Sequence, residues 1–589
     1  DDAPVVDPEL RAMTAMLERR GPDRTGAWRN GPVGVGHTLL ATTPELSIER
    51  QPFRHAESDC VITADVRLDN RAELYDALQM QRPLESIGDA ELILNAYLAW
   101  GDDCPKRLLG DFAFALWDAR AQRLFCARDH FGLRAFYYHH AVGQRFHFAS
   151  DARAILVSSR VPYRINQGRI ADFLVPQLEW IDYTSTFFED VYRLPPGHSA
   201  VVTRDRLVIE EYWKPAPGPE LGPMSDDDYR EGFLEVFTRA TESRLRAYVE
   251  KFGSMLSGGM DSGSVVVVAK DVLGSSGAGP LKTLSATRQQ DDDCAESRAI
   301  RAAIAIPLLS PTLVYLEDIA GQFEFLTAGN AEPFDGEATI LKAIYLAART
   351  EGLNVLLDGA GGDVVLSEGS YIARLLRRGH FNRALREIAG ENRFWGGGML
   401  VRNALKYVQT AFVPEFAKQR FNGARHRRRV SDYLESSLVS REFALAVDIE
   451  ERFARMRQMS PRGWVGDYAV ERCNVIRPSV TAGRERYARL AAGMAIEARD
   501  PFLDKRVVDF CSRLPGRFRL RDGWPKAILR DLMAGKLPEE VLWGRGKPHL
   551  GRGQNIIGRD GPGPAGRAQR LRGRRTGDSS RTCQGPARR

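Results

Sequence analysis

Short stretches of alternating apolar and polar residues fill most of the first two hundred positions of the chain. Alternation with a period of two indicates strands that bury one face, and apolar residues three and four apart indicate amphipathic helices. The pattern predicts strands at 33–40, 60–66, 124–127, 135–139 and 145–149, and helices at 7–19, 71–78 and 89–100. Strands outnumber helices, so this half is expected to pack sheets face to face with helices outside.

The second half of the chain has a different pattern, in which apolar strands alternate with helices. Strands are predicted just before 257–262 and at 281–286, 313–316 and 354–357, and a long helix is predicted at 295–305. This alternation favours a doubly wound parallel sheet, in which ligands bind at the carboxyl ends of the strands. The predicted fold class is therefore α/β.

A run rich in proline and glycine separates the two halves. It spans 215–223, and Ser225 then caps a helix whose first turn holds three aspartates. We predict domains at 1–205 and 226–550, with a linker at 206–225.

The arginine-rich stretch from Tyr371 to Ser460 is predicted to be helical. Two helices, at 372–388 and 432–447, are expected there. They form either a surface for a peptide or other substrate, or plain scaffold, and the pattern leaves both interpretations open.

Composition places the chain among soluble globular proteins. It has 589 residues, of which 43% are hydrophobic and 27% are charged, and this length is too great for a single core. No apolar run approaches the roughly 18 residues that a membrane span needs, and the first residues lack a signal-peptide pattern, so a cytoplasmic location is expected. Seven scattered cysteines without a C-x-x-C pair suggest neither a disulfide framework nor a zinc site.

The net charge of +6 comes from one segment. Residues 551–589 hold ten arginines, no lysine and two aspartates, so this segment carries +8 and the rest of the chain carries −2. The segment is rich in Gly, Pro, Ser and Gln and is expected to be a disordered tail. An RNA-binding arm is one interpretation; we favour a frayed or frame-shifted end, so nucleic acid is not the expected partner.

The glycine turn Ser257-Gly258-Gly259-Met260-Asp261-Ser262 carries the strongest candidate chemistry. Two adjacent glycines let backbone N–H groups approach an anion, the serines add hydroxyl donors, and the following helix directs its positive end to the same place. These features predict a pyrophosphate cradle in which Asp261 holds Mg²⁺ against phosphate oxygens. A plain turn at the end of a strand is the competing interpretation.

Two resemblances follow from motifs. The order S-G-G-x-D-S resembles the loop of the N-type ATP pyrophosphatases, which leave AMP on a substrate. R-G-P-D at 20–23, G-D-F-A-F-A-L-W-D at 110–118, A-R-D-H-F-G at 127–132 and F-A-S-D at 148–151 look like the glutaminase half of glutamine-hydrolysing asparagine synthetases. Together they cover nearly all of the chain up to about residue 550. The resemblance implies an αββα sandwich of the N-terminal-nucleophile glutaminase type, a parallel-sheet ATP-pyrophosphatase domain, and the use of ATP and Mg²⁺.

A second glycine-rich turn, at 358–363, supplies the second predicted metal ligand. Its glycines permit close backbone approach to a ligand, which makes Gly361 a binding candidate, although a plain turn is again the alternative. The turn resembles the family's S-G-E-G-x-D-E motif, which implies that Asp363 shares Mg²⁺ with Asp261. The resemblance also places adenine and ribose at the strand end Ser285-Ala286, mainly against backbone groups.

Two catalytic candidates lie nearer the C-terminus. E-A-R-D-P-F-L-D at 497–504 resembles a motif near the synthetase cleft, which makes Glu497 a candidate. Lys526 lies in a G-x-x-K-x-x-L-R frame and matches the lysine that meets the α phosphate and the departing pyrophosphate. A lone lysine on a helix is usually just solvated, but the frame favours the functional role.

The glutaminase residues of the resembled family are largely missing. Its nucleophile is an N-terminal cysteine, whereas this sequence begins with Asp1 and has no cysteine before Cys60, so its first strand is expected to be absent and the cysteine stays undecided. The clamp motif H-R-R-L-A reads H-T-L-L-A at 37–41, and the oxyanion motif N-G-E aligns with 63–65. Of the residues with which the family binds glutamine, only Asp89 is retained in this sequence. We therefore predict a glutaminase fold in 1–205 that no longer hydrolyses glutamine.

The predicted function is that of an ATP-dependent carbon–nitrogen ligase that adenylates a carboxylate and forms an amide. Ala360 stands where asparagine synthetases carry a glutamate and β-lactam synthetases a tyrosine, so channelled ammonia is not the expected nucleophile. R-L-D-N at 67–70 and R-G-K-P-H-L-G at 545–551 look more like lasso-peptide macrocyclases. A precursor peptide is then the expected substrate, with a leader peptidase as a partner. A glutamine-hydrolysing asparagine synthetase and an inactive scaffold are the alternatives.

Overall fold

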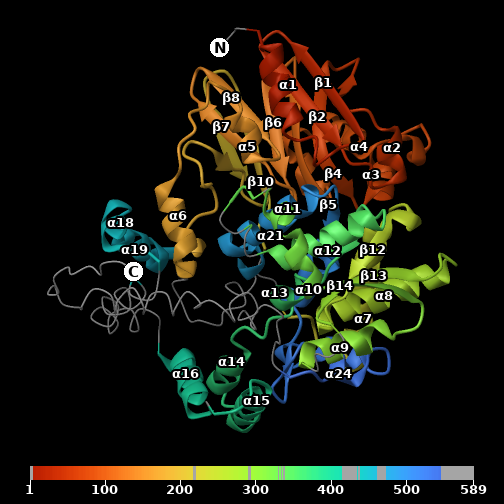
Figure 1. Cartoon of the computed structure of the whole chain (residues 1–589), viewed down its shortest axis with the longest axis vertical. Helices are drawn as coiled ribbons and strands as arrows, with labels where there is room; N and C mark the ends of the chain where they lie inside the picture. The colour runs from red at the N-terminus through yellow and green to blue at the C-terminus, as the bar shows by residue number, and fades with distance from the viewer. Residues whose placement is uncertain are drawn as a thin grey trace, which may run out of the picture.

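The computed structural model describes residues 4–545, apart from 216–219, 290–293, 329, 333–334, 336–337, 399, 414–433, 435–437 and 460–472. The predicted tail at 551–589, nearly all of the segment at 545–551 and part of the predicted helix at 432–447 lie outside the described residues. Figure 1 shows an N-terminal domain in red to orange stacked on a C-terminal domain in green to blue. No helix in the described part of the chain is long and apolar enough to cross a membrane.

Antiparallel sheets form the first domain. A six-stranded sheet has the order β11-β10-β6-β5-β4-β3, a three-stranded sheet has the order β8-β7-β9, and β1 pairs with β2. The strands are β1 (Arg24–Asn30), β2 (Val33–Leu39), β3 (Phe53–His55), β4 (Cys60–Leu68), β5 (Gly110–Asp118), β6 (Arg123–Arg128), β7 (Tyr137–Ala141), β8 (Arg145–Ala149), β9 (Tyr192–Arg193), β10 (His198–Val202) and β11 (Leu207–Glu211). The hydrophobic pattern does not predict β1, because none of its side chains is fully buried.

Helices cover the outer faces of these sheets. α4 (Asp89–Trp100) packs its apolar side on the six-stranded sheet, and α5 (Ala152–Leu156) packs on the three-stranded sheet. Between the sheets, Ala115 and Cys126 face Phe136 and Tyr138. The layer order of helix, sheet, sheet, helix confirms the predicted sandwich. The other helices of this domain are α1 (Asp7–Ala15), α2 (Pro44–Ile48), α3 (Arg71–Ala77) and α6 (Gln167–Leu174).

The first domain extends past the boundary predicted at residue 205. β11 is the edge strand of the six-stranded sheet and pairs with β10 from Leu207 to Glu211. Trp213 then packs edge-on against Phe131, with ring centroids 5.3 Å apart. The linker therefore begins after Trp213, because β11 pairs with the sheet through its backbone although the sequence analysis placed it in the linker.

A five-stranded parallel sheet forms the centre of the second domain. Its order is β14-β13-β12-β15-β16, and the neighbouring strands pair in parallel. The strands are β12 (Phe252–Met255), β13 (Leu281–Thr287), β14 (Leu309–Tyr315), β15 (Val355–Leu357) and β16 (Glu497–Arg499). The α/β prediction is confirmed. β16 was not predicted, because its sequence Glu-Ala-Arg has no apolar run.

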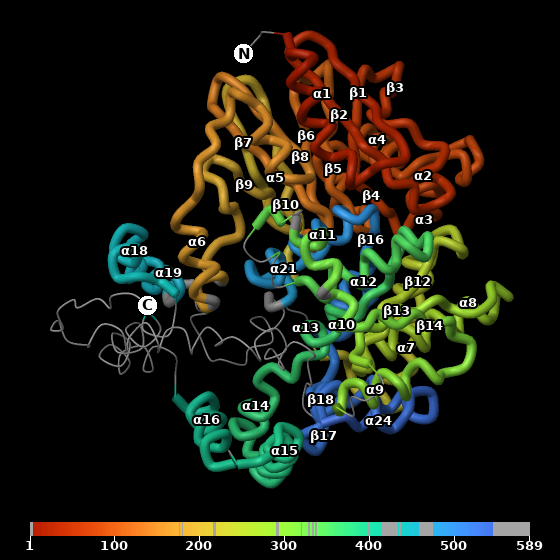
Figure 2. The backbone as a smooth tube through the Cα atoms, in the orientation of Figure 1, coloured from red at the N-terminus to blue at the C-terminus, as the bar shows by residue number. Residues whose placement is uncertain are grey.

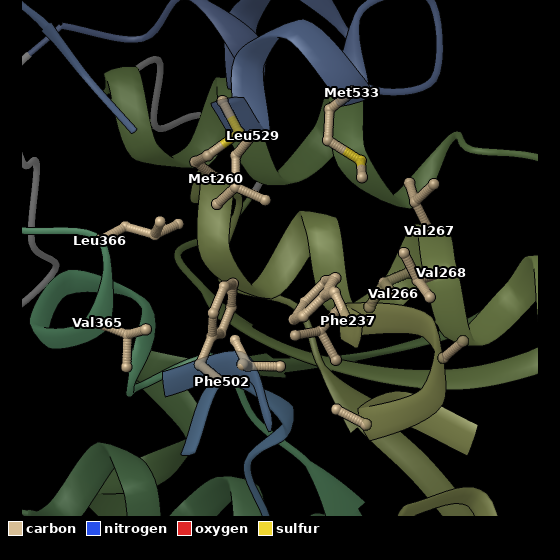
Figure 3. Packing of buried hydrophobic residues seen from close by; sticks show 14 of the residues in the cluster. Phe237, Met260, Val266, Val267, Val268, Val365, Leu366, Phe502, Leu529 and Met533 are labelled. Atoms are coloured by element: carbon tan, nitrogen blue, oxygen red, sulfur yellow. The ribbon is translucent and has the colours of Figure 1, made fainter. Parts of the chain in front are cut away.

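The main core of this domain lies between helices and the sheet. Ser225 and Asp228 form a capping box at the start of α7 (Asp226–Leu245), as the aspartate-rich first turn predicts. In Figure 3, Val266 and Val268 of α8 (Met260–Ser275) lie close to Phe237 of α7, and Leu529 of α23 (Ala527–Met533) lies beside Met260. The other elements are α9 (Ala295–Ile304), α10 (Leu316–Ile319), α11 (Phe323–Ala328), α12 (Thr339–Thr350), α13 (Gly362–Val365), α19 (Ile449–Met459), α21 (Pro478–Ala492), α22 (Lys505–Ser512), α24 (Glu539–Leu542), β17 (Leu520–Arg521) and β18 (Trp524–Pro525).

Three helices form a module that stands beside the parallel-sheet domain (Figure 1). The single helix predicted at 372–388 is in fact two, α14 (Tyr371–Arg377) and α15 (Phe381–Phe394), because Gly379 adopts a φ of +78° between them. α16 (Leu400–Phe412) packs on both. Within the predicted helix at 432–447, the described residues contain the shorter α18 (Arg441–Ala446).

Candidate active site

The predicted phosphate loop lies between β12 and the start of α8, as its sequence indicates. Gly258 adopts a φ of +71°, which favours glycine. A Cβ atom on Gly258 would lie 2.8 Å from the Ile300 nitrogen and 3.0 Å from the Ala299 carbonyl carbon, both in α9. Glycine is therefore required here both for the turn and for the close approach of a neighbouring helix.

Two serines close this loop on itself. The Ser257 N–H donates to Ser262 Oγ at 3.1 Å, and the two hydroxyl oxygens lie 2.9 Å apart. Ser262 Oγ also donates to the Gly259 carbonyl oxygen at 3.3 Å. These bonds hold the loop in one shape at the N-terminal end of α8, where backbone N–H groups lack partners within the helix and favour an anion.

Three predicted site residues meet beside this loop. Lys526 Nζ lies 2.6 Å from Asp363 Oδ1 and also donates to Asp261 Oδ2. Burial alone would lower the pKa of Lys526, but the carboxylates of Asp261 and Asp363 outweigh burial and raise it above its ordinary value. The amine is therefore a cation, held between two anions from distant parts of the chain.

This arrangement fits a metal shared by the two aspartates. The lysine ammonium shows that both carboxylates reach a single cation. The glycine turn that carries Asp363 packs directly on Asp261, because a Cβ atom on Gly359 would lie 2.7 Å from the Asp261 carbonyl carbon. Carboxylate oxygens are the ligands that Mg²⁺ prefers, with phosphate and water completing its coordination.

Lys526 is held in place by its backbone. It precedes α23 with a φ of +58°, a strained conformation for a residue other than glycine, and its N–H donates to the Arg519 carbonyl oxygen at 2.6 Å. Arg530, one helical turn later, stacks with its guanidinium carbon 4.8 Å from the Trp524 ring centroid. Burial lowers the pKa of Arg530 to about 10, against the opposing effect of Asp261. The sequence frame contained this arginine, but gave it no role.

Two predicted ligand-binding residues have their polar groups engaged inside the protein. Ser285 Oγ donates to the Leu256 carbonyl oxygen at 2.6 Å, which joins β13 to the end of β12. The Gly361 N–H donates to Asp500 Oδ2 at 2.6 Å. The Ser285 hydroxyl therefore helps to hold β13 beside β12, and the Gly361 amide helps to hold the glycine turn.

Glu497 does not join the lysine cluster. Its Oε1 accepts hydrogen bonds from Arg134 Nη2 at 2.7 Å and Arg499 Nε at 2.8 Å, and Thr42 donates to the other oxygen. Burial alone would raise its pKa, but these arginines together with Arg67 hold it well below its ordinary value. The described contacts make Glu497 a buried ion-pair residue at the boundary between domains and do not support its predicted catalytic role.

In the same motif, Asp500 contacts the glycine turn that carries Asp363, and the sequence analysis gave it no role. Asp500 Oδ2 holds the glycine turn through Gly361 and also accepts a hydrogen bond from Arg484. Arg484 further lies 3.5 Å from Asp358 Oδ1, at the start of that turn. Only its position three residues after Glu497 in the motif could have drawn attention to it.

The R-L-D-N segment at 67–70 lies at the boundary between the two domains. Arg67 pairs with Asp69 at 3.0 Å and with Asp111 at 2.7 Å inside the first domain. Asp69 Oδ2 lies 3.3 Å from Nη1 of Arg244 in α7, and Arg244 in turn pairs with Asp504 at 2.7 Å. The segment thus joins the domains through buried ion pairs, a role that its sequence did not reveal.

The positions that replace the glutaminase motifs line a cavity of about 170 Å³ between the domains. His37 Nδ1 lies 3.0 Å from Thr63 Oγ1, and burial lowers the pKa of His37 to about 4, so its ring is neutral. Asp65 lies 3.4 Å from Arg134. Asp89 is buried, and its carboxylate accepts hydrogen bonds from Arg71 and from the Leu68 N–H, so it is engaged within the protein.

A glycine-rich turn at the carboxyl end of a parallel strand, with two carboxylates and a lysine converging on it, defines an α/β protein that handles a phosphate-bearing ligand. Comparison with known families agrees. Residues 3–213 match the glutamine amidotransferase domain family, and residues 232–554 match the asparagine synthase family. The chain belongs to the asparagine synthase family, which consists of ATP-dependent carbon–nitrogen ligases.

Individual relatives are distant. The chain is 25% identical over 547 residues to asparagine synthetase (glutamine-hydrolyzing) 3 of Bacillus subtilis (strain 168), which covers 91% of this chain and 83% of the relative. It is 31% identical over 286 residues to amidase chry2 of Gibberella zeae, covering 46% of this chain and 40% of the relative. A solved glutamine phosphoribosylpyrophosphate amidotransferase from B. subtilis is 13% identical, with a TM-score of 0.27 over 47% of this chain and 63% of that chain.

Proposed function

We propose that this protein uses ATP to adenylate a carboxylate, releases pyrophosphate, and then joins the activated carboxylate to an amine with release of AMP. The observation that carries the proposal is the convergence of Lys526, Asp261 and Asp363 beside the loop at 257–262. A site built for transfer of the terminal phosphate would leave ADP; this loop instead suits a pyrophosphate leaving group, as its S-G-G-x-D-S order suggests.

Each residue has a stated part in the proposed reaction. Asp261 and Asp363 would hold Mg²⁺, which when bound neutralises charge on the phosphate oxygens. Lys526 remains protonated, because its pKa is raised, and its ammonium offsets negative charge on the α phosphate and on the departing pyrophosphate. The loop serines and the first N–H groups of α8 would hold the pyrophosphate, and Asp500 keeps the Asp363 turn in position.

We further propose that the substrate is a peptide whose Asp or Glu side chain is joined to its own α-amine, as in a lasso peptide. A carboxylate oxygen attacks the α phosphorus and pyrophosphate leaves; the amine nitrogen then attacks the acyl carbon and AMP leaves. Ala360 supports this proposal, because its exposed methyl group cannot act as the base or ammonia-handling residue that a glutamate supplies in asparagine synthetases. The base would then come from the substrate or from another residue.

We also propose that the first domain does not hydrolyse glutamine. The ion pairs of Asp89 with Arg71 and Arg246 leave it engaged within the protein. The His37 ring is neutral and the nearby Asp65 pairs with Arg134, so neither supplies the positive charge that the clamp arginine of the family motif would give. In this proposal the domain acts as a structural partner of the ligase domain.

The decisive test identifies the products. The purified protein is incubated with Mg²⁺, ATP and any short precursor peptide found encoded beside its gene, and nucleotides and peptide mass are measured. We expect AMP and pyrophosphate, with a peptide lighter by one water. ADP as the product would refute the adenylation proposal. Asparagine formed from aspartate with ammonia or glutamine, and no change in any peptide, would instead assign the function of the named B. subtilis relative.

A further inference from the structure

Helix α16 exposes a second apolar face. Ala404, Tyr407 and Ala411 pack inward against α14 and α15. A separate set, defined here as the α16 stripe, recurs at i, i+4, i+7 and i+11 and is solvent-exposed: Val401 (72%), Leu405 (57%), Val408 (44%) and Phe412 (49%). Residues at this spacing form one continuous line on a helix. A surface helix needs one apolar face for its own fold, so the second is available for a partner.

Positive charge predominates in the three-helix module that carries this stripe. Between Tyr371 and Val413 the sequence holds eight arginines and lysines but two glutamates. Both glutamates are engaged by other groups of the protein: Glu387 Oε2 accepts the Gly523 N–H at 2.9 Å, and Glu391 Oε2 accepts the Tyr407 hydroxyl at 2.7 Å. Arg402 and Lys406 lie exposed on α16 itself. The charge of the surface therefore favours an acidic partner.

The module is also attached to the turn that carries Lys526. The Glu387–Gly523 hydrogen bond ties α15 to the hairpin of β17 and β18, and Figure 2 shows these elements side by side. Phe394 of α15 packs edge-on against Trp524, with ring centroids 5.6 Å apart. Trp524 lies two residues before Lys526. A chain docked on this module would therefore be held by the part of the protein that positions the reacting lysine.

We propose that the α16 stripe docks an acidic amphipathic segment of the peptide substrate. The inference rests on the proposed function, since it gives that peptide a second anchor away from its reacting carboxylate. Apolar side chains of the segment would cover the stripe, and its carboxylates would pair with Arg402 and Lys406. Attachment of the module to the Lys526 hairpin favours the substrate over a membrane surface or a second copy of this chain, because neither of those has to reach Lys526.

Binding of a defined probe tests this proposal without turnover. The probe is a fluorescent peptide of about 15 residues with leucines at i, i+4, i+7 and i+11 and glutamates between them, titrated into the full-length protein and followed by anisotropy. We expect saturable binding that weakens at least about tenfold in the Leu405→Ser/Val408→Ser variant and in Arg402→Glu. The matched control is Val249→Ser, which changes an equally exposed apolar residue elsewhere and should leave binding unchanged.

Two further measurements separate the alternatives. A probe with lysines in place of the glutamates should bind at least about tenfold more weakly, and equal binding would overturn the acidic preference. The protein and its stripe variants are also tested for binding to phosphatidylserine vesicles and for concentration-dependent dimerisation. If the variants abolish either of these while probe binding is unaffected, the proposal is overturned in favour of a membrane or a second copy. AMP formation by the stripe variants with saturating peptide reports the proposed function separately, so either proposal can fail alone.

Discussion

Lys526 and Asp261 are separated by 265 positions in the sequence, yet they share an ionic contact. A buried ammonium is costly unless it is paired, and here two carboxylates repay its desolvation and keep it protonated. The same pairing places both aspartates where a divalent cation would need them. At the scale of single residues, the site is therefore a charge cluster whose members depend on one another.

Asp261→Asn is expected to lower AMP formation by at least about 100-fold, because it removes one metal ligand and one partner of Lys526. Pyrophosphate release with substrate and Mg²⁺–ATP measures the effect. Asp271→Asn changes the same residue type at an exposed position of α8 and should retain near-normal activity. Equal activity of the two variants would contradict the assigned role of Asp261.

Glu49 provides a test of pH dependence. Burial, reinforced by Asp89, raises the pKa of Glu49 to about 8 from an ordinary value of about 4.5. The folded protein therefore holds a proton that the unfolded chain releases between these values, so the free energy of unfolding should fall as pH rises from about 4.5 to 8, by an amount on the order of a few kcal/mol. Glu49→Gln should flatten this slope in denaturant titrations. The exposed Glu57→Gln should leave it unchanged, and an unaltered slope in Glu49→Gln would reject the argument.

At the scale of elements, the phosphate loop depends on the close approach of two helices. α8 begins at the end of the loop, and α9 packs so near that no side chain fits at Gly258. The turn at 358–363 completes the site from the next strand of the sheet, since β15 lies beside β12. Parallel neighbours bring their carboxyl ends to the same edge, which explains why two separate glycine turns meet.

Gly258→Ala should weaken binding of Mg²⁺–ATP and lower the thermal stability. The left-handed conformation costs an alanine about 1–2 kcal/mol, and its Cβ would also push against α9. Gly277→Ala is a matched control, because Gly277 has the same φ of +71° with no atoms within 4 Å of the added Cβ. Calorimetry and thermal unfolding compare the two. If both variants lose similar Mg²⁺–ATP affinity and similar thermal stability, the contact between Gly258 and α9 contributes nothing to either property.

At the scale of the whole molecule, buried ion pairs join the first domain to the site. Asp69 of the first domain pairs with Arg244, whose Nε also donates to the Asp500 carbonyl oxygen at 2.9 Å. Asp500 holds Gly361 in the turn that ends at Asp363. These buried contacts therefore connect the first domain to the turn that carries Asp363.

Asp69→Asn is expected to reduce stability on the order of 3 kcal/mol, because it leaves Arg67 and Arg244 with fewer buried partners. Ligase activity should fall as well, although Asp69 has no described contact with the lysine cluster. Asp59→Asn, which removes one partner of an exposed pair with Arg54, should change stability by less than about 1 kcal/mol. Chemical denaturation and AMP formation are the measurements, and unchanged activity in a destabilised Asp69 variant would show that the domain interface does not govern the site.

The sequence by itself determined the parts of this protein that depend on local pattern. Period-two alternation predicted the antiparallel sandwich, strand–helix alternation predicted the parallel sheet, and the glycine turn at 257–262 was found with its strand and helix. Lys526 and Asp363 were selected because their short segments resemble motifs of a known family. Each of these signals lies within a few residues, so no knowledge of distant contacts is needed to detect it.

Only the tertiary structure decided which side chains face one another. Glu497 and Asp500 belong to one motif, but the first pairs with arginines at the domain boundary and the second holds the glycine turn. Ser285 is engaged by a neighbouring strand, and the R-L-D-N segment at 67–70 forms part of an interface between domains. These contacts join residues between 29 and 363 positions apart, and no local pattern in the sequence records them.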